Sequence, residues 1–439
     1  MPLKDVNRMS KHEAPRRRRS SAKRRARTQI LWTAVPVLIL AFLCLACFPR
    51  FLPGGLIPVA GPEAPSEPAA DSSIAESKPQ EPEKEPEPVV QTVRFSATGD
   101  DLIHSPIYKQ AKRRASGSEA YSFDYCYEHI APFYAKQDVN WINQETLCND
   151  ELEPSSYPCF STPGDCARAL YRAGVRVFSL SNNHTYDKGA AGIAATLRFW
   201  ESMPEDVVTT GFWRGVDDYS RIPTQTVNGV TIAYLSYTEH TNGIPQSSAM
   251  TANVIYTSQT DVIEQQVRAA RKAADFVVVG VHWGVENSHT IVDSQRTLAQ
   301  QLADWGADVI VGTHPHVLQD AQWLIAQDGR KVFAAYSLGN FLSTQNKPDQ
   351  LVGAILTAQF QKTTDPDGTV QTAVLMPELH PTVTHYDAGK SNVRTYLLCD
   401  YTQELARQHG ARADYSNFSL DTAREIAQNN ISADFLTLT

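Results

Sequence analysis

The chain has 439 residues, and its 40 Lys and Arg against 48 Asp and Glu give a formal net charge of −8. This balance argues against a nucleic-acid partner, which requires a broad excess of basic residues. The chain has no overall positive charge to attract an anionic ligand, so such a ligand would have to be bound by a local metal ion or arginine. The length is sufficient for one large folded domain with additional terminal segments.

The N-terminal region has the pattern of a membrane anchor. The first 27 residues hold eleven Lys or Arg against two acids, and residues 30–48 contain no charge. At about 1.5 Å per residue, these nineteen positions span roughly 28 Å, close to the thickness of a bilayer core. We predict a basic cytoplasmic segment over residues 1–29, a transmembrane signal-anchor helix over 30–48 and an extracellular C-terminal domain, that is, a single-pass protein of the cell membrane. A cleaved signal peptide, a lipoprotein signal ending before Cys47 and a nucleic-acid-binding basic cluster are the alternatives.

A proline-rich segment follows the anchor. Residues 49–90 contain ten prolines and seven glutamates with almost no aromatic residues. Such a composition cannot bury enough apolar surface to offset the entropy of ordering, so it predicts a disordered stalk. The folded domain is expected over residues 91–400, followed by a C-terminal tail over 401–439 with one helix, Ser419–Gln428.

The folded region alternates strands and helices. Buried strands are predicted from short β-branched or apolar runs at Val93–Thr98, Val175–Leu180, Val207–Thr210, Phe276–Val281 and Asp308–Val311. Amphipathic helices are predicted at Asp165–Ala173, Ala190–Ser202, Asp261–Ala274 and Ser294–Trp305. Hairpins are expected where Asn228-Gly229, Asp328-Gly329 and a turn near Asp365 interrupt strand-like segments. The order indicates an α/β fold in which two mixed sheets pack face to face between helices.

Five cysteines follow the predicted anchor. Cys148, Cys159 and Cys166 are close in sequence, whereas Cys126 and Cys399 are separate. Outside the cell an oxidising environment favours disulfides, so we expect one disulfide within the close group. The spacing does not identify its partners and does not resemble a metal-binding framework.

Acidic, amide and imidazole side chains directly follow four of the predicted strands. Asp100 follows the first strand, His184 and His282 follow two later ones, and His314 and His316 flank Pro315 after the last. In α/β sheets, ligands gather at the carboxyl ends of strands. Imidazole and carboxylate are the usual ligands of zinc, manganese and iron, so the pattern predicts a metal site. Pro315 favours extended backbone around it, which would direct both neighbouring imidazoles to the same face.

Seven strings follow one another in the sequence: Ala97-Thr-Gly-Asp-Asp-Leu-Ile-His104, Val139-Asn-Trp-Ile-Asn-Gln-Glu-Thr146, Tyr157-Pro-Cys-Phe160, Leu180-Ser-Asn-Asn-His-Thr-Tyr-Asp-Lys-Gly189, Val281-His-Trp-Gly-Val-Glu286, Val311-Gly-Thr-His-Pro-His316 and Tyr336-Ser-Leu-Gly-Asn-Phe341. In this order they resemble the CapA family of bacterial capsule or poly-γ-glutamate synthesis proteins. That family is in turn similar to the calcineurin-type metallophosphoesterases. The resemblance implies their four-layer sandwich of two mixed β-sheets flanked by helices.

The resemblance also implies roles for individual residues. His184 would protonate the leaving oxygen. The implied metal ligands are Asp100, Glu145, Asn183, His282, His314 and His316. The implied substrate-binding or supporting residues are Asp101, His104, Asn143 and Glu286. For each of these residues a structural role is the alternative: a turn aspartate at Asp100, a surface acid at Glu145, a loop amide at Asn183 and a buried core histidine at His282.

One departure bears on the number of metals. Phosphoesterases of this type open with Asp-x-His, but here Asp100 is followed two residues later by Leu102. We therefore expect one or two divalent ions, of Mn, Zn or Fe. The implied process is capsule or poly-γ-glutamate biosynthesis, by a metal-dependent hydrolase or transferase. The alternative is a non-catalytic factor that binds the anionic polymer or its synthesis and export machinery.

Overall fold

The structure is a computed structural model that describes residues 87–438. The predicted cytoplasmic segment and anchor, and nearly all of the predicted stalk, lie outside the described residues. Among the residues that are described, no helix is long and apolar enough to cross a membrane.

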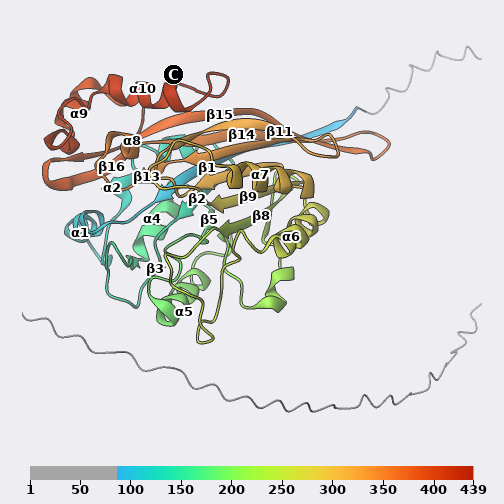
Figure 1. Cartoon of the computed structure of the whole chain (residues 1–439), viewed down its shortest axis with the longest axis horizontal. Coiled ribbons are helices and arrows are strands. Elements are labelled where there is room, and N and C mark those ends of the chain that lie inside the picture. Colours follow the sequence, from blue (N-terminus) through green and yellow to red (C-terminus); the bar gives the residue numbers. More distant parts are fainter. Residues whose placement is uncertain (1–86, 439) are drawn as a thin grey trace, which may run out of the picture. The chain divides into compact units, whose positions relative to one another are not determined.

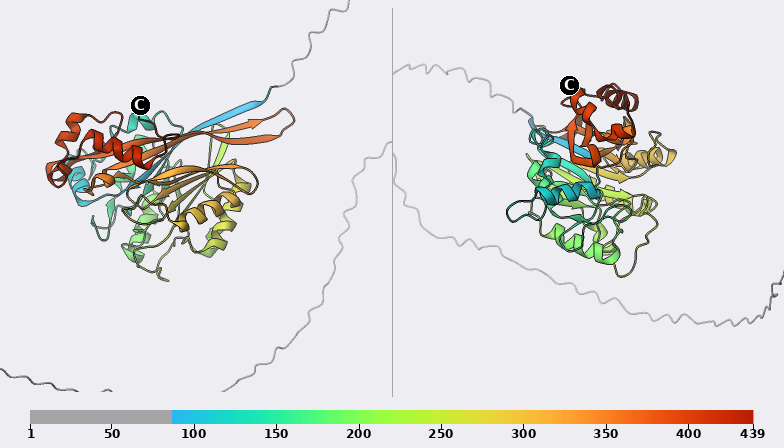
Figure 2. Two further views of the ribbon diagram at one scale, coloured as in Figure 1. Left: turned by 45° about the horizontal axis from the view of Figure 1, so that its top comes forward. Right: turned by 90° about the vertical axis from the view of Figure 1, so that its left-hand side faces the viewer.

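The larger sheet has eight strands in the order β16-β15-β14-β1-β2-β5-β6, with β13 beside β1 (Figure 1). Strands β1, β2, β5 and β6 are parallel neighbours, whereas β14, β15 and β16 are antiparallel, so the sheet is mixed. Its strands are β1 Val89–Asp101, β2 Val139–Gln144, β5 Val177–Ser179, β6 Val208–Thr210, β13 Asn340–Leu342, β14 Val352–Thr364, β15 Val370–Asp387 and β16 Ser391–Leu397. Figure 2 shows the start of β1 projecting together with the β14–β15 hairpin.

The smaller sheet has six strands in the order β11-β12-β10-β9-β8-β7. The central strands β8, β9, β10 and β12 run parallel, and the hairpins β7–β8 and β11–β12 are antiparallel. Its strands are β7 Thr224–Val227, β8 Val230–Thr238, β9 Phe276–His282, β10 Val309–Thr313, β11 Leu318–Ile325 and β12 Lys331–Leu338. A separate pair is formed by β3 Cys148–Asn149 and β4 Thr162–Pro163.

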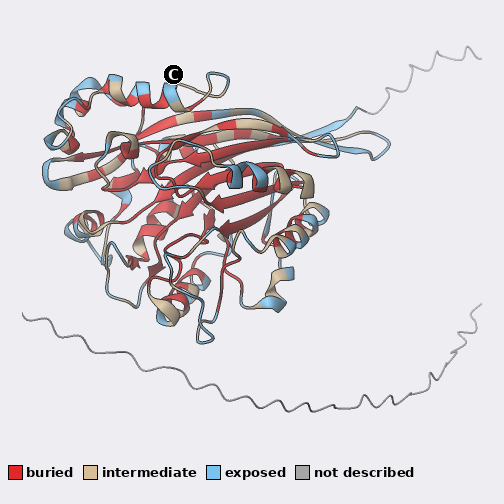
Figure 3. Cartoon of the chain, viewed as in Figure 1, coloured by how far each residue is buried: buried red, intermediate tan, exposed pale blue. Residues whose placement is uncertain are grey.

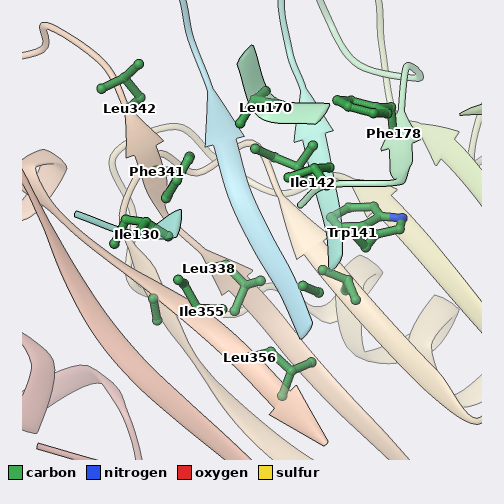
Figure 4. Packing of buried hydrophobic residues seen from close by; sticks show 14 of the residues in the cluster. Ile130, Trp141, Ile142, Leu170, Phe178, Leu338, Phe341, Leu342, Ile355 and Leu356 are labelled. Carbon is green, nitrogen blue, oxygen red and sulfur yellow. The ribbon is translucent and has the colours of Figure 1, made fainter. Parts of the chain in front are cut away.

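The two sheets pack face to face over the main hydrophobic core. Phe360 of β14 stacks on Phe276 of β9 with ring centroids 4.6 Å apart. Gly280 of β9 lies against the Trp141 side chain of β2, so that a Cβ there would come within 2.7 Å of the indole. Figures 3 and 4 show the buried strands and the residues of this core, among them Trp141. The close approach explains why an otherwise β-branched strand contains a glycine.

Helices pack on the sheets. The apolar residues of α6 Thr260–Ala273 and α7 Asp293–Trp305 form a second core with one face of β8 and β9. The remaining helices are α1 Ser105–Arg114, α2 Asp124–Tyr127, α3 Ala131–Tyr134, α4 Asp165–Ala173, α5 Gly189–Glu201, α8 Pro348–Leu351, α9 Gln403–Gln408 and α10 Leu420–Asn430. The predicted α/β class, the mixed sheets, the four central helices and the three hairpins are thus confirmed, to within two residues at the ends of the helices.

Two expectations are corrected. The segment 401–438 contains two α-helices, because α9 precedes the predicted helix α10. Helix α9 has only six residues, which are too few to show a helical periodicity of apolar residues in the sequence. All five cysteines within the described residues are free thiols, so the expected disulfide within the Cys148, Cys159 and Cys166 group is absent there.

Candidate metal centre

The predicted site residues lie at the carboxyl ends of parallel strands from both sheets. Asp100 is at the end of β1, Glu145 follows β2, Asn183 follows β5, His282 ends β9 and the histidine pair follows β10. Because neighbouring parallel strands end at the same edge, residues far apart in sequence converge there. His316 Nδ1 lies 3.1 Å from Asp100 Oδ2, although 216 residues separate them.

The first group of ligand-type atoms surrounds the Nε2 atom of His282. This nitrogen lies 3.1 Å from Asn183 Oδ1 and 3.2 Å from His314 Nδ1. It also lies 3.8 Å from Glu145 Oε1. All four side chains are buried. Two imidazoles, an amide oxygen and a carboxylate are ligand types that a divalent ion such as zinc or manganese accepts.

The second group shares Glu145 with the first. His316 Nε2 lies 3.6 Å from Glu145 Oε1, and its Nδ1 faces Asp100. The ligand atoms of Asp100, Glu145 and His316 all lie within 4.8 Å of one another. Glu145 thus lies between the two groups, as a carboxylate that bridges two ions would.

One carboxylate of the site lacks hydrogen bonds. Both carboxylate oxygens of Glu145 are buried without a hydrogen-bond partner. Burial, together with the charge of Asp100, raises the pKa of Glu145 well above its usual range. A buried carboxylate without hydrogen bonds is costly, and an ion would remove that cost. The residues present therefore fit a divalent metal.

The histidines differ in protonation. Burial lowers the pKa of His282 well below its usual range and that of His314 to about 2, with neighbouring histidines adding to the effect. Both rings are therefore neutral and able to ligate. Burial also acts to lower the pKa of His316, but the charges of Glu145 and Asp100 outweigh it and raise the pKa to about 9.

The backbone around Pro315 corrects the sequence argument. We expected extended geometry, but His314 and His316 have φ values of 98° and 58°. Positive φ is rare for residues with a side chain and costs on the order of 1–3 kcal/mol. Both imidazoles still face the site, yet a tight turn, and not the alternation of an extended strand, directs them there. Strain of this kind gathers at functional sites.

His184 lies beside the ligands and is held by its own loop. Its Nδ1 lies 2.8 Å from Asp187 Oδ2, and that same oxygen accepts the Phe160 N–H at 2.6 Å. The Phe160 ring meets the His184 ring edge to face, with centroids 4.7 Å apart. Asn242 Nδ2 lies 3.4 Å from His184 Nδ1. Because Nδ1 is engaged by Asp187, Nε2 is the nitrogen left to meet a ligand.

The four predicted supporting residues have different environments. Asn143 Nδ2 donates to Asp100 Oδ1 at 2.8 Å. Asp101 accepts instead from the hydroxyl of Tyr127, on helix α2, at 3.2 Å. His104 Nδ1 lies 3.2 Å from the Thr344 backbone nitrogen, and burial lowers its pKa to about 3. Glu286 is exposed.

Sequence reasoning missed three residues of the site. Thr313 contacts His282, Asp187 contacts His184, and the His240 ring lies edge to face with His314 at a centroid distance of 4.9 Å. His240 follows β8, another parallel strand that ends at the same edge. The string Tyr237-Thr-Glu-His240 therefore carries the same signal as the other site histidines, which is an imidazole directly after a parallel strand.

Comparison with known proteins identifies the family. Residues 94–345 match the family described as bacterial capsule synthesis protein PGA_cap. The PGA biosynthesis protein CapA of Bacillus subtilis (strain 168) is 31% identical over 253 residues, which cover 57% of this chain and 63% of that protein. The capsule biosynthesis protein CapA of Bacillus anthracis is 32% identical over 242 residues, covering 51% and 55%. The matches thus span less than two thirds of either relative.

A solved structure is also similar. The calcineurin-like phosphoesterase YfkN from Bacillus subtilis aligns with 76% of this chain and 100% of that chain, at 12% identity and a TM-score of 0.36. The family match extends over more than half of the chain and contains every one of the predicted site residues. The chain therefore belongs to the PGA_cap family of bacterial capsule synthesis proteins, as its sequence strings predicted.

Proposed function

We propose that this protein is a metal-dependent hydrolase or transferase of capsule or poly-γ-glutamate synthesis. The observation that carries the proposal is the buried Glu145 carboxylate, which has no hydrogen-bond partner and lies between two groups of ligand-type side chains. The names of the two CapA relatives support the process. The four-layer metallophosphoesterase architecture is part of the same proposal.

The metal would be held by this chain's own residues. His282, His314 and Asn183 would hold one ion, Asp100 and His316 a second, and Glu145 both. Bound there, a divalent ion would polarise the scissile group and lower the pKa of a bound water. Nitrogen and oxygen ligands together fit Zn, Mn or Fe better than Mg or Ca, which prefer oxygen alone.

His184 is the proposed proton donor. Asp187 accepts from Nδ1 and so orients the ring, which supports Nε2 as the atom that transfers a proton to the leaving oxygen of the broken bond. The His184 side chain is nearly buried, with 6% exposure, so a bound substrate would exclude water from it. Nothing in simple binding of a polymer requires this pair next to Asn183.

A non-catalytic role is the second candidate. In it, the metal centre binds carboxylates of the anionic polymer, or a component of its synthesis and export machinery, without turnover. The observation in its favour is Leu102, a buried apolar residue at the position where a ligand histidine would open the site. Loss of one ligand weakens one metal position and so favours binding over two-metal chemistry.

The test uses the full-length chain in a screen of phosphoesters and poly-γ-glutamate with added Mn²⁺, Zn²⁺ or Fe²⁺. For the enzyme, His184→Ala should retain metal but lose about 10²–10⁴-fold in turnover. His316→Ala should lose metal first, because it removes a ligand. His380→Ala is the matched control, a partly buried histidine of β15 that is bonded to Thr357 and belongs to neither group of ligand-type side chains. Tight polymer binding without turnover for any metal would favour the second candidate.

Location is part of the proposal. The basic segment 1–29 and the uncharged run 30–48 support a single membrane anchor with the stalk 49–90 and the folded domain outside the cell. Protease added to intact cells should digest the folded domain and spare the N-terminal segment. A C-terminal domain protected in intact cells, but digested after lysis, would contradict this orientation.

A further inference from the structure

The hydroxyl of Thr313 meets the ring of His282 on the side opposite the candidate metal centre. Thr313 is the last residue of β10 and is the register partner of His282, the last residue of β9. Its Oγ1 lies 3.0 Å from His282 Nδ1, and both residues are buried with 2% exposure. The contact is therefore fixed by the pairing of two central strands.

The two nitrogens of His282 have different neighbours. Nε2 faces Asn183 Oδ1 and His314 Nδ1, which are ligand-type atoms. A neutral imidazole ligates through the nitrogen that carries no proton, so ligation by Nε2 requires a proton on Nδ1. That Nδ1–H is buried and needs an acceptor, since an unsatisfied buried donor is costly.

The only acceptor in hydrogen-bond contact with this nitrogen among the described residues is Thr313. Asn143 Nδ2 also approaches Nδ1, at 3.4 Å, but the same amide nitrogen donates to Asp100 Oδ1 at 2.8 Å. A carboxylate only accepts hydrogen bonds, so the Asn143 group that faces Asp100 is the N–H₂ group. An amide N–H₂ group cannot accept a hydrogen bond from His282 Nδ1–H. The Thr313 hydroxyl oxygen remains.

We propose that Thr313 is a positioning residue that accepts the Nδ1–H of His282 and so holds Nε2 toward the metal. The proposal rests on the proposed metal centre and adds a residue that contacts a ligand and no ion. Partners of this kind fix the tautomer and the orientation of a ligating ring, and their loss typically weakens metal binding by about 10–100-fold.

The chain offers a matched control on the neighbouring strand. Thr238 ends β8 and is the register partner of His282 on its other side. It is also buried, but its Oγ1 donates to the His240 carbonyl oxygen at 2.9 Å, and no contact with the His282 ring is present. Thr238→Val thus repeats the loss of a buried threonine hydroxyl next to His282 without removing the proposed acceptor.

The experiment measures Zn²⁺ and Mn²⁺ affinity of the metal-free full-length chain by competition calorimetry. Thr313→Val should bind about 10–100-fold more weakly than wild type, whereas Thr313→Ser, which keeps the hydroxyl, and Thr238→Val should stay within about threefold. Circular dichroism checks that each variant is folded. In ¹⁵N-histidine spectra of the Zn²⁺-loaded protein, an imidazole N–H protected from exchange should be present in wild type and Thr313→Ser.

The outcomes separate this inference from the proposed function. If wild type binds metal and Thr313→Val binds as tightly, or if Thr238→Val weakens binding equally, Thr313 has no positioning role although the metal centre stands. If Thr313→Val does not fold, the spectrum of wild type decides, and the absence of a protected imidazole N–H overturns the proposal. Wild type that binds neither ion would overturn both.

Discussion

Two adjacent carboxylates at the end of β1 have opposite surroundings. Asp100 faces the histidines, whereas Asp101 accepts hydrogen bonds from Tyr127 and Cys166. The register of β1 shifts between Thr98 and Asp100 and again between Asp100 and Asp101, and Asp101 meets side chains of helices α2 and α4. Burial raises the pKa of Asp101 to about 7, although the hydrogen bonds from Cys166 and Tyr127 act in the other direction. Only Asp100 can serve the metal centre.

The raised pKa of Asp101 predicts a pH dependence of stability. The folded state keeps the proton up to about pH 7, whereas the unfolded chain releases it near 3.8. The folded state therefore binds more protons between these values, and the free energy of unfolding falls as pH rises through this window. Asp101→Asn removes this contribution, so the variant should gain stability relative to wild type by a few kcal/mol from pH 4 to pH 7.

Urea unfolding of the metal-free wild type and Asp101→Asn at several pH values measures the difference. Asparagine can still accept from Tyr127, so the comparison isolates the charge. A stability difference that is constant from pH 4 to pH 8 would contradict the protonated, buried state of Asp101.

At the residue scale, the sequence predicted which side chains meet but not how they are oriented. Asp100, His282 and His316 follow strands, and parallel strand ends converge, so their meeting could be inferred. The positive φ of His314 and His316 could not, because proline restricts its neighbours without excluding a strained turn that tertiary contacts impose. The contact of Thr313 with His282 depends on strand register, which a single sequence does not give.

At the scale of elements, strong local sequence signals were sufficient to predict helix ends and hairpin turns. Helix α4 begins and ends where its amphipathic pattern does, and Gly174, at φ 112°, terminates it. The hairpin turns were likewise marked by Asn228-Gly229 and Asp328-Gly329. The short elements α2, α3, β3 and β4 have four residues or fewer and carry no period long enough to detect.

Strand β10 approaches its neighbour too closely for any side chain at Gly312. A Cβ there would lie 1.9 Å from the Tyr336 carbonyl oxygen on β12, a backbone atom that cannot move aside. Gly312→Ala should therefore lower the free energy of unfolding by more than about 3 kcal/mol and disturb the adjacent histidine turn. Chemical denaturation measures the loss.

Gly329 supplies the control for this prediction. It occupies the β11–β12 turn at φ 86°, with no atom near its missing side chain. Gly329→Ala should cost only about 1–2 kcal/mol, for the left-handed backbone alone. Equal losses for the two variants would show that the close approach of β10 and β12 is not what requires glycine at position 312.

At the scale of the whole molecule, the fold extends beyond the family match. The match ends at residue 345, but β14 pairs with β1 from Ile355 to Thr364, next to the strand that carries Asp100. The C-terminal segment continues the same structure, since Leu379 of β15 exchanges backbone hydrogen bonds with Phe435 and Thr437. Residues 401–438 therefore belong to the folded body of the protein.

Truncation after Cys399 should consequently destabilise the whole folded domain. It removes buried Tyr401, Phe418 and Ile431 and the Ser432 bond to Asp320 on β11. We expect a loss of several kcal/mol, from the apolar area exposed, seen as a lower melting temperature in calorimetry. Glu404→Ala removes one end of an exposed ion pair and should leave the melting temperature unchanged. A truncated chain as stable as the full chain would mean that the tail only covers the surface.

Metal content tests the central claim most directly. The full-length chain, purified and reloaded with Zn²⁺ or Mn²⁺, should retain one or two ions after desalting, measured by elemental analysis and by anomalous diffraction. His282→Ala combined with His314→Ala should abolish binding at the first group, whereas His380→Ala should bind as wild type does. Ions found about 2.0–2.3 Å from His282 Nε2, His314 Nδ1 and Glu145 would agree with the account. A wild-type chain that retains no ion, or one whose ion lies away from Glu145, would contradict it.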